Sequence, residues 1–297
     1  MKSLLTWLLS TVIMFWNVEN YFDTYDDPLT EDDDFTPAGS YHWNRTGFGK
    51  KRDGIAKTII AATDCYGEMP LMVGMAEVEN KYTMRQLTRH SPLSAFHYNY
   101  VHRNSPDGRG IDVALLYDAD RLHILKVDSI RVNGFRTRDI LYVVGVTRGT
   151  SKDTLHIFVN HWPSKISGAE SARRRAKVAK LLDSCAVSIL SSNPRAAIIA
   201  MGDFNDDRAD TTVKSLLHKE PVSGKGSYKY KGQWESIDHF FVSKTVDQKS
   251  DMHIFDAPFL LEEDKTYLGV KPKRTFVGPK HNGGLSDHLP IILQLIK

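Results

Sequence analysis

Acidic, amide and imidazole side chains recur at the ends of apolar segments throughout this 297-residue chain. Glu77 lies near the end of LMVGMAEV, and His161 follows TLHIFVN. Asp203 and Asn205 lie in GDFND, directly after another apolar run. Further positions of this kind are Asn17, Asp112, Asn160, Asp238, Asp287 and His288. Each one alone is typical of a turn, a helix cap or a structural histidine, but the repetition indicates a shared site.

The combination of residue types restricts the chemistry. Carboxylates and carboxamides without a cysteine or histidine cluster suit a hard divalent cation, so we expect Mg²⁺, with Mn²⁺ as a substitute, rather than zinc. A histidine paired with an aspartate suits proton transfer, because the carboxylate fixes the imidazole tautomer and raises its basicity. Together these groups fit metal-assisted hydrolysis of a phosphate ester.

Ten apolar or alternating segments predict the strands that would position these groups. They span residues 12–18, 71–78, 97–103, 111–118, 122–132, 140–148, 154–162, 195–204, 236–243 and 289–296. Helical periodicity is present over residues 50–63 and 169–190, and more weakly over 207–220. Many strands with few helices predict stacked sheets covered by helices, and not a doubly wound nucleotide-binding fold.

Composition favours one domain over residues 13–297, because no repeat or Pro- or Ser-rich linker divides the chain. The net charge of +3 excludes the strongly basic composition of a nucleic-acid coat protein. Any polyanion binding therefore requires local clustering of basic residues. Two cysteines, Cys65 and Cys185, exclude a disulfide framework, although one bridge could form in an exported protein.

Residues 1–12 begin with a lysine and an apolar run, as a targeting signal does. No small-residue cleavage site follows, so this segment is either a targeting remnant or an ordinary N-terminal segment. Periplasmic or secreted and cytoplasmic locations both stay open for this reason. The apolar run is too short for a membrane span, and polar residues follow it too closely.

Seven motifs, taken together, resemble the endonuclease/exonuclease/phosphatase superfamily, whose fold is that of DNase I. They are WNVEN, AEVENK, RGIDVALLY, VNHWPSK, GDFND, SIDHFFV and LSDHLPI, and they extend from Trp16 to Pro290. GDFN and SDHLP are each moderately specific, whereas all seven in the family's order are strong support. The resemblance implies an α+β fold, a four-layer α/β/β/α sandwich in which helices flank two mostly antiparallel sheets.

The resemblance also implies a role for each motif. Glu77 is expected to be the principal metal ligand, with Asn17 and Asp287 beside the metal. Asp203 is expected to activate or position the attacking water, and Asn205 to contact the phosphoryl oxygens. In the last two motifs, His288 would contact the scissile phosphate, and Asp238 would orient His288.

A second histidine–acid pair can be proposed from the same resemblance. His161 matches a second catalytic histidine of DNase-like members, where abasic-site repair members have tyrosine. Asp112 matches the acidic partner of that histidine, and otherwise it would bond Arg109 or a turn amide. If the pair forms, two imidazoles flank the phosphate, and one can serve as base while the other serves as acid.

Basic and aromatic residues near these motifs are candidate substrate contacts. Lys165 and Arg173 follow His161, and Arg109 precedes IDVALLY. Arginines at three consecutive helical positions cannot all face one way, so at least one of residues 173–175 is expected to be solvated. Trp162 could stack on a base or sugar, or it could pack in the core.

These observations predict a Mg²⁺-dependent phosphodiesterase that cleaves DNA or RNA, a monomer without a stable protein partner. The alternative is a phosphatase or lipid phosphodiesterase of the same fold, for inositol phosphates or sphingomyelin. Against it, WESIDHFFVS lacks the Pro-Ala-Trp-then-Asp-Arg run of inositol 5-phosphatases. A non-catalytic binding module is the remaining alternative, disfavoured because every motif keeps its acid, amide or histidine.

Overall fold

Two six-stranded sheets form the centre of the computed structural model, which describes residues 11–149, 152–206, 213–248 and 250–295. Sheet A has the order β13 (Ser250–Ile254), β18 (Ile291–Leu295), β1 (Val12–Tyr21), β2 (Met72–Val78), β4 (Asp112–Asp118) and β3 (Tyr98–His102). Sheet B has the order β5 (Leu122–Ile130), β6 (Ile140–Thr147), β7 (Thr154–His161), β8 (Ala197–Asp203), β12 (Asp238–Val242) and β9 (Leu217–Lys219).

Each sheet is antiparallel except for one parallel pair at its centre. The parallel pairs are β1 with β2 in sheet A and β7 with β8 in sheet B. A long helix makes each crossover, α1 (Arg45–Tyr66) between β1 and β2 and α3 (Ala169–Ser192) between β7 and β8. Parallel strands end at the same edge of a sheet, so polar residues that follow these four strands are brought together.

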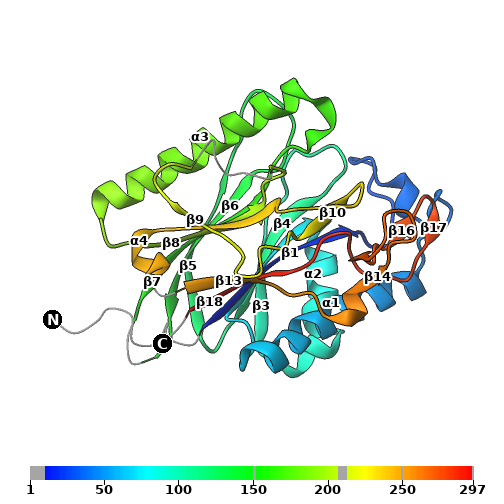
Figure 1. Cartoon of the computed structure of the whole chain (residues 1–297), viewed down its shortest axis with the longest axis horizontal. Coiled ribbons are helices and arrows are strands. Elements are labelled where there is room, and N and C mark those ends of the chain that lie inside the picture. Colours follow the sequence, from blue (N-terminus) through cyan, green and yellow to red (C-terminus); the bar gives the residue numbers. More distant parts are fainter. Residues whose placement is uncertain (1–10, 150–151, 207–212, 249, 296–297) are drawn as a thin grey trace.

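The layers are α1 with α2 (Lys81–Arg89), sheet A, sheet B, and α3 (Figure 1). One hydrophobic core fills the space between the sheets and under α1 and α2, and a second lies between sheet B and α3. Ile55 and Ile59 of α1 face the first core, and Val178 and Leu182 of α3 face the second. The expected four-layer sandwich is confirmed.

Local chemistry fixes where the first long helix begins and ends. The Asn44 side chain accepts hydrogen bonds from the amide N–H groups of Thr46 and Gly47, which have no partner inside the helix. Gly67 ends α1 with φ 83°, a left-handed conformation that glycine adopts without cost.

The structure corrects two sequence expectations about secondary structure. Helix α2 was not expected, and its start is fixed by a capping box between Asn80 and Thr83. A helix was expected over residues 207–220, but Leu217–Lys219 is strand β9, and residues 207–212 lie outside the described residues. In this edge strand, pairing with β12 outweighs a weak helical pattern.

Short elements complete the fold around these layers. The hairpin of β10 (Tyr228–Tyr230) and β11 (Gln233–Glu235) contacts β15, and Tyr228 forms a bridge with His288, just before β18. The others are η2 (Asp33–Phe35), η3 (Pro92–Ala95), η4 (Lys165–Ser167), α4 (Lys244–Asp247), η6 (Pro258–Leu260), β14 (Leu261–Glu263), β15 (Val270–Pro272), β16 (Phe276–Val277) and β17 (Lys280–His281).

The expectation for residues 1–12 falls almost wholly outside the described residues; Thr11 and Val12 are buried, and Val12 begins β1.

Cys65 on α1 and Cys185 on α3 are free thiols. Of the helices in the described residues, none is long and apolar enough to span a membrane.

Candidate active site

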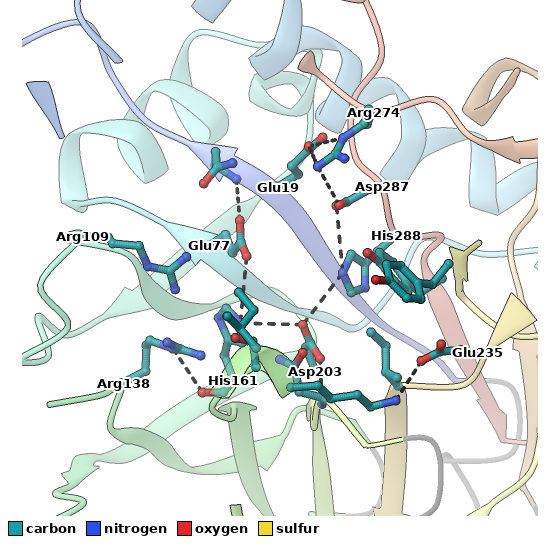
Figure 2. Close-up of a pocket in the computed structure, with 18 residues that line it drawn as sticks. Glu19, Glu77, Arg109, Arg138, His161, Asp203, Glu235, Arg274, Asp287 and His288 are labelled. Carbon is teal, nitrogen blue, oxygen red and sulfur yellow. Dashed lines mark hydrogen bonds and ion pairs between the residues drawn. The ribbon is translucent and has the colours of Figure 1, made fainter. Parts of the chain in front are cut away.

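A pocket of about 620 Å³ opens at the edge where the central parallel strands end. Figure 2 shows its polar lining, with the acidic side chains Glu19, Glu77 and Asp287 on one side of it. His161 and His288 lie on either side of Asp203 in this view. The pocket therefore combines residues from both sheets.

His288 is held by a buried hydrogen bond to Asp238. Nδ1–H of His288 donates to Oδ2 of Asp238 across 2.7 Å, and the Ser227 hydroxyl donates to the same oxygen. Burial lowers the pKa of His288, but the Asp238 carboxylate outweighs it, and the pKa lies well above the ordinary value. His288 is therefore cationic at neutral pH, as an orienting aspartate would make it.

Asp203 lies where the two imidazoles converge. Its Oδ2 is 3.6 Å from Nε2 of His161 and 3.9 Å from Nε2 of His288. Burial raises the pKa of Asp203 to about 7, although His288 lowers it. Asp203 can therefore both hold and release a proton near neutral pH.

His161 is buried and does not contact Asp112. Its Nε2 faces Glu77 and Asp203, and its Nδ1 has no hydrogen-bond partner among the described residues. Burial, and then Arg138, lower the pKa of His161 well below the ordinary value, so the imidazole is neutral at pH 7. The two facing carboxylates favour the tautomer with its proton on Nε2.

Asp112 has other partners, which corrects the expected pairing. Its Oδ1 accepts hydrogen bonds from the backbone N–H and the hydroxyl of Ser105, and its Oδ2 lies 3.3 Å from Nε2 of His102. Asp112 begins β4 and points toward β3, so it fixes a turn, the alternative that the sequence left open.

Irregular strand ends direct the acidic side chains into the pocket. The β1–β2 register shifts after Asn17, and the β2–β4 register shifts at Glu77. Glu19, Asn20, Glu77 and Asn205 all have positive φ, between 48° and 62°. Such conformations are uncommon for residues other than glycine and cluster at functional sites. The amide N–H of Asn20 then donates to Oε2 of Glu77.

Asn17 turns its amide nitrogen, not its oxygen, toward the carboxylates. Its Nδ2 donates to Oδ2 of Asp203 at 3.0 Å and lies 3.4 Å from Oε1 of Glu77. Its Oδ1 accepts the N–H of Glu19. An amide nitrogen cannot bind a cation, so Asn17 orients Asp203 in this structure instead of acting as a ligand.

Two neighbouring groups of donor atoms could hold a cation. Ligand atoms of Asp203, Asp238 and His288 lie within 4.8 Å of one another, but the His288–Asp238 hydrogen bond occupies two of them. Glu77 and Asp287 present further carboxylate oxygens to the pocket. Burial, and then Glu19, raise the pKa of Asp287 to about 6, which indicates concentrated negative charge that a hard cation would relieve.

The basic residues divide into those at the pocket and those elsewhere. Arg109 and Lys165 line it, and Lys165 forms a 2.8 Å ion pair with Glu235 of the hairpin. Arg173 is exposed on α3 and does not line the pocket. Of the three consecutive arginines, Arg175 is the buried one, bonded to Asp206 and to the Pro163 carbonyl.

Trp162 is part of the core, which excludes stacking on a substrate. Its indole N–H donates to Oδ1 of Asn160, and its ring contacts Phe204 edge to face.

Asn205 lines the pocket and donates from Nδ2 to the Trp162 carbonyl. A β-carbon at Gly202 would lie 2.4 Å from the Asn160 carbonyl oxygen, so this close strand approach requires glycine.

Several residues that line the pocket were not expected from the sequence, and three of them lie against the expected site residues. Arg138 is buried, paired with Asp107, and donates to the His161 and Trp162 carbonyls. Arg274 bridges Glu19 and Asp287. The Tyr228 ring lies 4.9 Å from the His288 ring. Arg138 and Arg274 lie in loops with no motif, and the aromatic hairpin YKYKGQW was the only available signal for Tyr228.

Comparison with known proteins shows the family of the chain. A model of the Endonuclease/Exonuclease/phosphatase family matches residues 12–297. The chain belongs to this family. It is a metal-dependent phosphoesterase, which sets aside a non-catalytic binding module. No curated protein matches the chain.

Solved structures show the same fold at low sequence identity. Truncated TDP2 from Caenorhabditis elegans matches with a TM-score of 0.62 and 15% identity, covering 97% of each chain. A mannosyl-6-phosphatase from Bacteroides thetaiotaomicron matches with a TM-score of 0.58 and 14% identity, covering 97% of this chain and 100% of the other. D. rerio TDP2 complexed with a single-strand DNA product matches with a TM-score of 0.54 and 14% identity. This match covers 97% of this chain and 99% of the other.

Proposed function

We propose that the protein is a Mg²⁺-dependent phosphodiesterase that cleaves nucleic acid. The observation that carries this proposal is the convergence of two differently charged imidazoles on one carboxylate. Nε2 of neutral His161 and Nε2 of cationic His288 lie 3.6 and 3.9 Å from Oδ2 of Asp203. A phosphoryl group placed between them would meet a base, an acid and a hydrogen-bond donor.

The protonation states assign one role to each group. Asp203, with its pKa near 7, positions the attacking water and accepts its proton. His288, kept cationic by Asp238, contacts the phosphoryl oxygens and can protonate the leaving oxygen. His161, neutral with its proton on Nε2, donates a hydrogen bond to a phosphoryl oxygen. Asn205 at the pocket wall can donate to the same group.

Glu77 and Asp287 would hold the cation, and Mg²⁺ suits their hard oxygen donors better than zinc does, with Mn²⁺ as a substitute. When bound, the cation would neutralise charge that develops on the phosphoryl oxygens. Asn17 maintains this geometry by its hydrogen bond to Asp203.

The rim of the pocket supports a nucleic-acid substrate. Arg109 and Lys165 can contact phosphates, and Tyr230 and Ile166, 50% and 92% exposed, offer surface for a base or sugar. The structural similarity to TDP2 with bound single-strand DNA product gives further support. A sugar phosphatase is the second candidate, favoured by the similarity to the mannosyl-6-phosphatase.

A substrate panel tests the proposal. Purified protein is incubated with plasmid DNA, RNA, bis-p-nitrophenyl phosphate and sugar and inositol phosphates, with Mg²⁺ or EDTA. We expect Mg²⁺-dependent cleavage of nucleic acid, and His288→Ala and Asp203→Asn should each reduce turnover by about a hundredfold or more. Turnover of phosphomonoesters alone would refute the proposal in favour of the second candidate.

A further inference from the structure

A second cavity, of about 550 Å³, lies outside the active-site pocket, between α2, β3 and β5. We name it the basic groove. Its basic lining residues are Lys81, Arg85, Arg89 and Arg103, and in the part of the chain that the structure describes no acidic residue lines it. Helix α2 packs beside β3, the outer strand of sheet A (Figure 1). The groove runs along this strand, because residues 99–103 line it.

The cations of α2 form one row. Lys81, Arg85 and Arg89 are spaced four residues apart, and all three are exposed, while the opposite face of α2 buries Met84 and Leu87. Residues four apart in a helix lie on the same face. The three charges therefore point to the same side of the helix.

No acidic side chain of the described residues pairs with this row. None of the four groove cations forms an ion pair with another described residue, whereas Arg121, which follows β4, pairs with both Asp118 and Glu68. Like charges four residues apart disfavour a helix, and Lys81 lies at the positive end of the helix dipole. An anion supplied from outside the chain would relieve both effects.

The spacing of the row fits a phosphate backbone. Eight residues of helix separate Lys81 from Arg89, about 12 Å at 1.5 Å per residue. One nucleic-acid strand presents a phosphate about every 3.4 Å along a duplex axis, so the row spans roughly three phosphates.

The groove is connected to the active-site pocket by one loop. Arg103 lines the groove at the start of the loop, and Arg109 lines the pocket near its end. Asp112 fixes this loop through the N–H of Ser105 and lies beside His102 of the groove wall. One loop, held in place by Asp112, therefore contributes Arg103 to the groove and Arg109 to the pocket.

We propose that the basic groove binds the phosphate backbone of a nucleic-acid strand, next to the segment whose phosphodiester lies in the active-site pocket. This inference rests on the proposed nuclease function. It assigns a binding site to the part of the nucleic acid that lies outside the active-site pocket. The groove would act on affinity for long substrates and not on the bond-breaking step.

The test is a triple charge reversal, K81E/R85E/R89E, made in His288→Ala protein so that the probe stays intact. Binding of a fluorescent 30-base-pair DNA duplex is measured by anisotropy over a range of salt concentrations. We expect the affinity for the duplex to fall at least about tenfold. The slope of log affinity against log salt concentration should become shallower by about two to three, because each lost phosphate contact removes about 0.9 from it.

The matched control is K57E/R195E/K244E, which changes net charge equally at exposed cations on α1, before β8 and on α4. It should keep most of the affinity and the salt slope. In otherwise wild-type protein, the groove variant should hydrolyse bis-p-nitrophenyl phosphate at the wild-type rate, which shows that the fold is intact. Cleavage of long duplexes should then show a raised KM.

Equal affinities for the groove variant and the control would overturn the proposal. Binding to anionic phosphatidylserine vesicles that the groove variant alone loses, with duplex binding unchanged, would also overturn it and assign the groove to a membrane. Failure of the wild-type protein to hydrolyse any phosphodiester refutes the proposed function instead, because the binding measurement does not depend on cleavage.

Discussion

His288 and Asp238 join the two sheets of the molecule through one buried hydrogen bond of 2.7 Å. Asp238 begins β12 in sheet B, and His288 precedes β18 in sheet A. The His288 N–H donates to the Ser286 hydroxyl oxygen, and Trp16 donates to the His288 carbonyl. Backbone and ring are both fixed, so this imidazole enters the reaction already oriented.

Asp238→Asn should lower turnover and change its pH dependence. The raised pKa of His288 keeps the imidazole cationic above neutral pH, so activity that needs the cation is lost only as pH rises through that raised value. Removing the anion should move this alkaline limb to lower pH and reduce kcat about ten- to a hundredfold. A pH–rate profile measures both, and an unchanged alkaline limb would contradict the assignment.

His161→Ala and Asp112→Asn should have different effects. His161 faces Asp203, so its removal should reduce kcat by about a hundredfold. Asp112 contacts Ser105 and His102 instead, so Asp112→Asn should leave kcat on a small phosphodiester within about twofold. Equal losses of kcat in the two variants would restore the catalytic pairing that the sequence suggested.

Removal of the divalent cation should abolish activity, and Glu77→Gln should weaken the cation site. Isothermal titration of Mg²⁺ should show an affinity reduced at least about tenfold, because one charged oxygen donor is lost. Glu263→Gln, at an exposed residue of β14, is the control and should bind Mg²⁺ normally. Full activity of protein dialysed against EDTA would exclude a metal requirement.

Trp162→Phe should reduce stability without affecting substrate binding. The change removes the indole hydrogen bond to Asn160 in a buried position, so the free energy of unfolding should fall by about 1–3 kcal/mol. Tyr230→Ala is the opposite case, because its ring is exposed at the pocket rim: KM should rise with stability unchanged. Denaturant titration and steady-state kinetics separate the two effects.

Arg109→Ala should raise KM for a nucleic-acid substrate several-fold, whereas Arg173→Ala should not. Arg109 lines the pocket, and Arg173 is an exposed residue of α3 outside it. A lost phosphate contact weakens binding about equally in the ground and transition states, so kcat should change little. A raised KM in Arg173→Ala alone would place the substrate across α3 instead.

The sequence by itself determined the layers of the fold and the central acidic, amide and imidazole residues of the pocket. Alternating strands and two amphipathic helices predict stacked sheets under helices, because each apolar face has to be buried. Glu77 and Asp203 lie at the ends of buried strands and His288 shortly precedes another, and strand ends that share a sheet edge meet. The seven ordered motifs added the family and the expected roles.

Only the tertiary structure decided which side chains face one another. Asp112 and His161 fit the same chemistry by residue type, yet Asp112 points to β3 while His161 faces Asp203, because side-chain direction depends on strand neighbours. Trp162 enters the core for the same reason. Arg138 and Arg274 are brought to the pocket by loops, where sequence periodicity gives no information about direction.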